Sequence, residues 1–294
     1  MSSPKCKDPI ALNLWYAIAP LEEVLDGKVE RSILLEQPIA FTREPSGQIA
    51  VWSHDGDGAR PVGASLPVQE RYGYFWTTLG TPDADIFAIP EYDEPDRRNI
   101  HAASFGVNAS APRLVENFLD MGHFPYVHTD ILGAEPHTEV KEYFVERSDE
   151  RDEILATNCK FWQPMASRAS SGGADVDYIY RVPHPYCSVL YKSAAIDPAR
   201  MDAIAIFIQP ITQESVRVHM MLSLLDDTST DLDIRLFQQT IFGQDKPILE
   251  NQYPKRLPLD PRAETPIRAD KSAIVYRRWL SDKGITYGVI PAAA

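Results

Sequence analysis

Short runs in which apolar and polar residues alternate dominate the first hundred residues. Segment 31–52, RSILLEQPIAFTREPSGQIAVW, holds two such runs around the turn signal REPSGQ, and RYGYFWTTLG at 71–80 is a third, aromatic-rich run. Alternation with a period of two, together with β-branched and aromatic residues, is typical of half-buried strands. Between Trp52 and Val68 the chain is rich in Gly, Pro and Asp, which predicts a loop. This region therefore predicts a small all-β lobe.

Six further segments of strand length follow in the second half of the chain. Turn or charge clusters separate them, and few helical patterns lie between them, which favours an antiparallel sheet. The segments are TEVKEYFVE (138–146), DEILATNCKFW (152–162), DVDYIYRV (175–182), CSVLYKSAAI (187–196), AIAIFIQPI (203–211) and SVRVHMMLSLL (215–225). The Pro- and Asp-rich stretch 81–99 has no periodicity and is expected to connect the lobe to this sheet.

Three stretches carry helical spacing. The first begins at Leu114 and is expected to run to about Gly122, because Pro125 lacks the backbone N–H that a continuing helix needs. The second, at 231–252, has apolar positions at helical spacing, although it contains a glycine and a proline in its second half. The third spans roughly 268–282. An antiparallel sheet with helices packed on one face is an α+β fold.

Charge and cysteine content limit the possible partners and the cellular location of the protein. Lys and Arg number 29 against 42 for Asp and Glu, a net charge of -13, so repulsion from phosphate disfavours a nucleic-acid partner. Cys6, Cys159 and Cys187 are odd in number and widely spaced, which fits neither a disulfide framework nor a CxxC metal site. The N-terminus lacks a signal-peptide pattern and the longest apolar run, at 203–208, is too short for a bilayer. We expect a cytoplasmic protein without a membrane partner.

One stretch, ENFLDMGHFPYVHTDILG at 116–133, carries candidate metal chemistry. On a regular helix His123 and His128 would lie about 140° apart, too far around the axis to hold one ion. A break caused by Pro125 removes this objection, because His128 can then fold back beside His123. Asp120 lies three residues before His123, from where its carboxylate can orient the imidazole. The alternative is that these histidines are ordinary surface or core residues.

Two histidines and one carboxylate form the ligand set that leaves open coordination positions on non-haem Fe(II). A third ligand must come from elsewhere in the chain. Asp245 is our candidate, because it is the acidic residue in a helical segment otherwise lined by apolar and amide side chains. If that helix persists through Pro247, Phe242 and Leu249 share a face with Asp245 and could line a substrate pocket, although ordinary core packing explains them equally well.

The same stretch resembles the motif N-x2-D-x2-H-x4-H of Rieske non-haem iron oxygenases, with Asn117, Asp120, His123 and His128 at the matching positions. The segment FGQDKPILENQ at 242–252 resembles the late helix of that family, whose aspartate corresponds to Asp245. The resemblance extends from LNLWYAIAPLEEV (12–24) through YGYFWTTLG (72–80) to RADKSAIVYRRWL (268–280). It therefore covers nearly the whole chain.

This resemblance implies a catalytic α subunit with a helix-grip-like catalytic domain at 96–294 and a small Rieske-like β lobe at 1–95. It implies that His123, His128 and Asp245 hold mononuclear Fe(II), and that Asn117 supports the site from nearby. In the family an aspartate matching Asp120 carries electrons from the cluster of one subunit to the iron of the next. The implied enzyme is a non-haem iron monooxygenase.

The chain departs from the family where the [2Fe-2S] cluster belongs. Members bind this cluster through CxH and CxxH pairs on two loops. The corresponding stretch, Ser53–Pro67, offers only His54 and contains no cysteine. The lobe is therefore expected to lack a cluster, and a Rieske-containing reductase must supply the electrons, with NAD(P)H, flavin and the cluster all on partner proteins. Because the family forms rings, a homo- or hetero-oligomer with related oxygenase subunits is also expected.

Within the family, the segments ENFLDM, HTDILGAEP, FGQD and YRRWL are most similar to the cluster-lacking catalytic subunits of bacterial methylxanthine N-demethylases that act on the N7-methyl group. The implied reaction is oxidative N-demethylation of a methylxanthine, such as 7-methylxanthine, with release of formaldehyde. Three alternatives remain open: an O-demethylase or hydroxylase of another small aromatic, a non-catalytic assembly subunit of a heteromeric oxygenase, and a carrier of apolar ligands.

Overall fold

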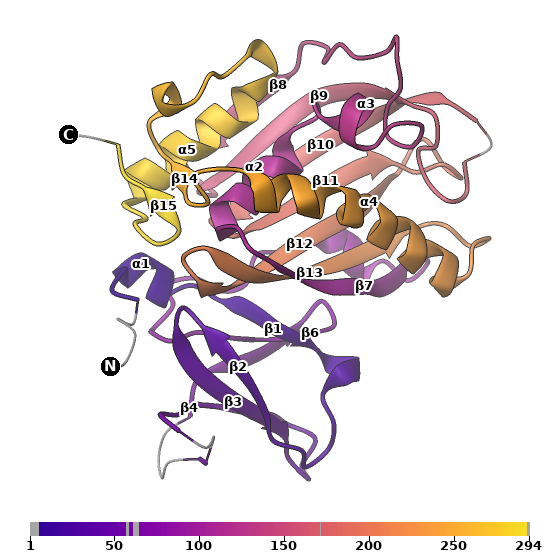
Figure 1. The fold of residues 1–294 in the computed structure, drawn as a ribbon. Coiled ribbons are helices and arrows are strands. Elements are labelled where there is room, and N and C mark those ends of the chain that lie inside the picture. Colours follow the sequence, from indigo (N-terminus) through magenta and orange to yellow (C-terminus); the bar gives the residue numbers. More distant parts are fainter. Residues whose placement is uncertain (1–5, 57–58, 61–64, 171, 293–294) are drawn as a thin grey trace.

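The structure is a computed structural model that describes residues 6–292 except 57–58, 61–64 and 171 (Figure 1). The expected cluster-lacking loop, Ser53–Pro67, thus lies partly outside the described residues. None of the helices within the described ranges is both long and apolar enough to cross a membrane.

The N-terminal part of the described chain forms a small β lobe, drawn in indigo and purple at the bottom of Figure 1. It holds two three-stranded sheets with the strand orders β1-β6-β5 and β2-β3-β4. Strands β3 and β4 pair across the predicted REPSGQ turn. The six strands are β1 (Tyr16–Pro20), β2 (Glu30–Leu34), β3 (Gln37–Arg43), β4 (Ile49–Ser53), β5 (Val68–Arg71) and β6 (Tyr74–Thr77).

A seven-stranded antiparallel sheet forms the centre of the molecule, with the order β7-β13-β12-β11-β10-β9-β8. Each of the six segments predicted as strands overlaps one strand of this sheet, which confirms the antiparallel sheet. The strands are β7 (Arg98–Val107), β8 (Phe144–Ser148), β9 (Glu153–Gln163), β10 (Ala174–His184), β11 (Cys187–Ser193), β12 (Met201–Thr212) and β13 (Ser215–Leu224).

Strand β7 was not predicted, because its sequence, RNIHAASFGV, mixes polar, small and apolar residues without clear alternation. Its register with β13 shifts between Met220 and Met221, and such a bulge interrupts a period of two. Tertiary pairing with β13, rather than local β-propensity, therefore accounts for this strand.

Both faces of the central sheet are buried, and successive side chains of β12 alternate between them. Ile204 and Ile206 point toward the helices, whereas Ala203, Ala205 and Phe207 pack against the lobe and the connector around Trp76 and Ile86. Because side chains alternate along a strand, burial of both faces gives β12 its nearly continuous apolar sequence. The sheet therefore separates a helix-covered face from a lobe-covered face.

Three long helices cover one face of the sheet (Figure 1). They are α2 (Ala111–Leu119), α4 (Asp231–Asn251) and α5 (Lys271–Lys283); α1 (Pro9–Leu12) and α3 (Phe124–Val127) are single turns. Four short 3-10 helices, η1 (Leu21–Glu23), η2 (Pro90–Asp93), η3 (Pro261–Ala263) and η4 (Arg268–Asp270), and a parallel pair, β14 (Leu257–Pro258) and β15 (Val289–Ile290), complete the chain. This mixed fold with an antiparallel sheet agrees with the predicted α+β class.

Two helix boundaries differ from the expectations, and the extent of a third helix agrees with them. Helix α2 ends at Leu119, earlier than Gly122, and Pro125 lies in the first turn of α3, where its missing N–H is tolerated. Helix α4 continues without interruption through Pro247, which lies near its C-terminal end and leaves only one carbonyl without its usual partner. The last α-helix begins at Lys271 because residues 268–270 form the 3-10 turn η4.

Candidate metal centre

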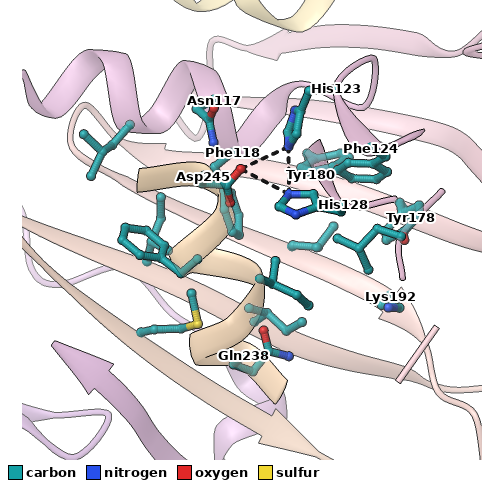
Figure 2. A pocket seen from close by; sticks show the side chains of 18 of the residues that line it. Asn117, Phe118, His123, Phe124, His128, Tyr178, Tyr180, Lys192, Gln238 and Asp245 are labelled. Carbon is teal, nitrogen blue, oxygen red and sulfur yellow. Dashed lines mark hydrogen bonds and ion pairs between the residues drawn. The ribbon is translucent and has the colours of Figure 1, made fainter. Parts of the chain in front are cut away.

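The two histidines of the motif flank the single-turn helix α3. His123 is its N-cap residue and His128 its C-cap residue, so neither occupies a regular helical position. Gly133 holds this turn in place from the side: a Cβ atom there would lie 2.7 Å from the backbone nitrogen of Pro125. Because the two histidines flank this short turn, their imidazoles lie side by side and point toward Asp245 (Figure 2).

His123, His128 and Asp245 meet at one point, as Figure 2 shows. The Nε2 atoms of the histidines are 3.1 Å apart. Asp245 Oδ1 lies 3.3 Å from His123 Nε2 and 3.1 Å from His128 Nε2. The three side chains are 14%, 1% and 12% exposed, respectively. The site thus combines residues from two segments that are more than a hundred positions apart in the sequence.

The other ring nitrogen of each histidine has its own acceptor. His123 Nδ1 lies 3.1 Å from Asp120 Oδ2, and His128 Nδ1 lies 2.9 Å from the amide oxygen of Gln244. Because carboxylate and amide oxygens only accept, both Nδ1 atoms donate, and in a neutral imidazole the Nε2 atom then carries a lone pair. Asp245 Oδ1 is buried and accepts no hydrogen bond within the described ranges. Three lone pairs therefore converge on one buried point.

This arrangement favours a positive charge at its centre. Burial lowers the pKa of His123, but interactions with the carboxylates of Asp120 and Asp245 outweigh it and raise the pKa to about 9. Burial raises the pKa of Asp245, but both histidines oppose this effect and hold the pKa at about 2. Both pKa shifts reflect the attraction between the carboxylates and a positive charge at this point.

The spacing of the three atoms fits a divalent transition metal. An ion about 2.1 Å from ligand atoms at right angles to one another keeps those atoms about 3 Å apart. His123, His128 and Asp245 form the group whose ligand atoms all lie within 4.8 Å of one another in the described part of the chain. Two imidazoles and one carboxylate on one side of an ion are the ligand set of non-haem Fe(II) sites.

A cavity adjoins the three residues on the sheet side (Figure 2). The space in it that no atom fills is about 780 Å³, a figure that includes open solvent at its mouth. Asn117, Phe242 and Leu249, which the sequence nominated, line it together with the metal-site residues. Its other lining residues are Leu114, Phe118, Phe124, Leu132, Tyr178, Tyr180, Leu190, Lys192, Ile204, Ile206, Met220, Phe237, Gln238 and Ile241.

A second depression also reaches the site. Asn117 and His123 line it as well as the cavity, and Asp120, Glu264 and Asp270 lie along it. Asp120 accepts a hydrogen bond from Gly122 N at 2.7 Å, which fixes its carboxylate between the depression and His123. The metal centre thus has one neighbouring space for a small molecule and a separate surface that contacts His123 through Asp120.

Sequence reasoning missed several residues around the centre. Gln244 holds His128, and its only signal was its place directly before Asp245 in FGQD. Gln238 lies seven residues, or about two helical turns, before Asp245, so it shares a helix face with Asp245. The spacings of three and four residues that point to Phe242 and Leu249 do not reach it. Lys192 lies on β11, and no pattern in the sequence indicated that it faces the cavity.

The chain was compared with known proteins. Residues 107–283 match the family model of the vanillate O-demethylase oxygenase C-terminal domain. A probable methylxanthine N7-demethylase of Pseudomonas sp. (strain TJI-51) is 45% identical over 279 residues, 93% of this chain and 95% of the relative. The methylxanthine N3-demethylase of Pseudomonas putida is 25% identical over 226 residues, 76% of this chain and 61% of the relative.

Among solved structures, NdmA of Pseudomonas putida CBB5 with caffeine superposes with a TM-score of 0.72 at 18% identity, covering 92% of each chain, which supports the fold alone. The family match covers more than half of the chain, and the N7-demethylase relative is similar over nearly all of it. The chain therefore belongs to the Rieske-type non-haem iron oxygenases, and it is an oxidative monooxygenase of that family.

Proposed function

We propose that this protein is the oxygenase component of an oxidative N-demethylase that acts on a methylxanthine such as 7-methylxanthine. In this proposal His123, His128 and Asp245 hold one Fe(II). The observation that carries it is the buried meeting point of three ligand atoms beside a mostly apolar cavity. The 45% identical relative, a probable methylxanthine N7-demethylase, supports the choice of substrate.

The bound iron would supply the activation of dioxygen. Overall, one N-methyl group, one dioxygen, two electrons and two protons give an N-hydroxymethyl group and water. The C–N bond then breaks, with transfer of the hydroxyl proton to the ring nitrogen, to release formaldehyde and the demethylated heterocycle. The methyl carbon is oxidised, and both electrons from the partner go to the dioxygen oxygen that leaves as water.

The protein residues position the reactants for this reaction. Asp120 and Gln244 hold the two imidazoles so that both Nε2 atoms face Asp245. Apolar side chains such as Phe118, Phe242 and Leu249 line the cavity and would exclude water around a bound heterocycle. A planar substrate in this space would bring its methyl group to the metal end.

We propose that the electrons come from a Rieske-containing reductase, which also carries flavin and uses NAD(P)H. Two observations support this route: the lobe sequence at 53–67 contains no cysteine, and Asp120 joins His123 to the surface depression. In this account residues 1–95 are a Rieske-like lobe without a cluster, residues 96–294 are the catalytic domain, and the protein acts in the cytoplasm as an oligomer with itself or related subunits.

Anaerobic reconstitution tests the iron site. Wild-type protein should bind about one Fe(II) per chain without the visible absorbance of a cluster. His123→Ala and Asp245→Ala should each lose this iron. Undiminished binding in either variant would refute the site.

An activity assay with a cluster-bearing reductase tests the reaction. It should consume oxygen and form equal amounts of formaldehyde and demethylated product from 7-methylxanthine. Iron binding without turnover of any methylxanthine or methoxyaromatic would instead favour a non-catalytic assembly subunit.

The second candidate function is O-demethylation of a small methoxyaromatic. The family model, named for vanillate O-demethylase, favours it. The same reductase assay with 4-methoxybenzoate and vanillate separates the two, because only the O-demethylase releases formaldehyde from these compounds.

A further inference from the structure

The end of the cavity farthest from the metal centre carries polar groups that the proposed reaction does not use. Gln238 lies seven residues before Asp245 on α4, which places it on the same helix face about 10 Å along the axis. Its amide has no hydrogen-bond partner within the described ranges, and it lines the cavity with Lys192 (Figure 2). Both also line a smaller adjoining cavity, so they belong to the same end.

Lys192, on β11, places an ammonium group at the same end of the cavity as Gln238. The residue is only 7% exposed. Its ammonium donates to the backbone carbonyl of Ala166 and lies 5.9 Å from the centre of the Tyr178 ring. An ammonium has three N–H donors, so one carbonyl and one ring face leave part of its capacity free.

No carboxylate in the described ranges forms an ion pair with Lys192. Its cross-strand neighbour on β12 is Asp202, whose Oδ1 accepts a hydrogen bond from Leu225 N at 2.8 Å. Burial lowers the pKa of Lys192 to about 8 against the opposing effect of Asp202, so the side chain is still largely charged at neutral pH. A buried ammonium without an ion-pair partner is unfavourable unless something else compensates for the lost water.

Packing alone does not require a lysine at this position. A methionine would fill nearly the same space without the loss of hydration. With Fe(II) bound by one carboxylate, the other end of the cavity would also carry a net charge of about +1. An ammonium at one end and a bound ion at the other would favour an acceptor atom with negative charge between them, although the carboxylates of Asp202 and Asp226 line the adjoining cavity.

We propose that Lys192 determines specificity by binding an anionic acceptor atom at the end of the substrate opposite its methyl group. This inference rests on the proposed function and narrows its substrate class. Suitable acceptors are a ring carbonyl conjugated to a deprotonated ring nitrogen, as in a methylxanthine that keeps a ring N–H, or the carboxylate of a methoxyaromatic acid. Gln238 adds an amide donor beside the same atom.

Ligand binding without turnover tests the proposal. Isothermal titration of the full-length protein, without reductase or dioxygen, compares 7-methylxanthine with caffeine, which has no ionisable ring N–H. A second pair compares 4-methoxybenzoate with its neutral methyl ester. Each ligand pair is measured on wild type, Lys192→Met, Lys192→Arg and a control variant, Lys160→Met. The control alters a lysine on β9 that forms an ion pair with Asp177 at 3.1 Å. Both metal-free and Fe(II)-loaded protein are used.

In the ligand pair that wild type binds more tightly, Lys192→Met should weaken binding of the ionisable member by about 10- to 100-fold. Its neutral member should change less than about threefold, Lys192→Arg should retain most of the discrimination, and Lys160→Met should match wild type. The pair that responds identifies the source of the negative charge. Thermal unfolding checks each variant, and Lys192→Gln replaces the methionine variant if that one does not fold.

Equal changes for the ionisable and neutral members, or wild-type affinity in Lys192→Met, would overturn the proposal. So would wild-type protein that binds none of the four probes. Because the titration needs neither iron nor electrons, these outcomes are distinct from a failure of iron binding or demethylation, which would contradict the proposed function instead.

Discussion

The two faces of the seven-stranded sheet both bury histidines, yet their environments differ in charge. On the helix face, interactions with carboxylates outweigh burial and raise the pKa of His123 to about 9. On the lobe face, burial lowers the pKa values of His184 and His219 to about 3 each. Their Nδ1 atoms have neutral partners, Tyr186 N at 3.0 Å and Ser104 Oγ at 2.8 Å.

This difference separates a histidine that fills space from one that can hold a metal. Burial is common to both faces and therefore says little about chemistry. Converging carboxylates favour a cation at the helix face, whereas burial keeps the imidazoles of His184 and His219 uncharged at the lobe face. The following experiments test this contrast, beginning with the largest expected effect.

Removal of a ligand on the helix face should have the greatest effect. His128→Ala should lower Fe(II) affinity by well over the roughly 100-fold that loss of an outer partner causes, because it removes a ligand atom itself. The matched change on the lobe face, His219→Ala, should alter stability but leave about one Fe(II) per chain. Metal analysis after anaerobic loading measures both, and equal iron loss in the two variants would contradict the contrast.

Acid should destabilise the protein through its lobe face. His184 and His219 have folded-state pKa values far below the ordinary 6.5, so the unfolded chain binds protons more readily. Their contribution is fully present above about pH 6.5 and is lost as the pH falls toward 3. At about pH 4.5 each histidine should lower the free energy of unfolding by about 2–3 kcal/mol, as an upper bound.

Denaturant unfolding between pH 7 and 4.5 measures this effect in wild type. His184→Phe, which cannot titrate, should flatten the pH dependence. An unchanged slope in this variant would show that His184 does not remain neutral in the folded protein.

A backbone clash behind α3 should disturb the helix face selectively. Gly133→Ala would place a Cβ 2.7 Å from Pro125 N, and the backbone there has little room to move. We expect a loss of about 1–3 kcal/mol in the free energy of unfolding and weaker iron binding. Gly106→Ala is the control, because no atom lies within 4 Å of the added carbon. A Gly133→Ala protein with wild-type stability and iron content would contradict this role.

The smallest effect should come from the partner of His128. Gln244→Leu removes the acceptor of Nδ1 and should lower Fe(II) affinity by about 10- to 100-fold. Gln239→Leu makes the same change on the same helix, but that amide donates to the carbonyl of Ala102 at 3.0 Å and should leave iron affinity unchanged. Fe(II) titrations under anaerobic conditions compare the two variants. Equal affinities would show that Gln244 does not support iron binding through His128.

The predictable parts of the fold are those in which local pattern and tertiary structure agree. Strands β9 to β13 alternate or are continuously apolar because one or both faces of the sheet are buried there. Strand β7 could not be predicted, since His101 and Ser104 face the lobe and interrupt the apolar alternation. The expected end of α2 lies beyond the observed end because the prediction treats Pro125 as the residue that breaks this helix. In the structure Pro125 instead lies in the first turn of the next helix, α3.

The candidate site divides in the same way. Spacing within 116–133 and the family resemblance nominated His123, His128 and Asp245, which the structure brings together. Gln244 and Lys192 act through contacts between segments far apart in the sequence, to His128 and to the carbonyl of Ala166. Such contacts depend on how α4 and β11 pack around one cavity, which sequence periodicity does not encode.

Anomalous diffraction at the iron absorption edge, from crystals loaded with Fe(II) without oxygen, tests the central claim most directly. We predict a single strong peak about 2.1 Å from His123 Nε2, His128 Nε2 and Asp245 Oδ1. A peak elsewhere, or none in crystals that contain stoichiometric iron, would contradict it.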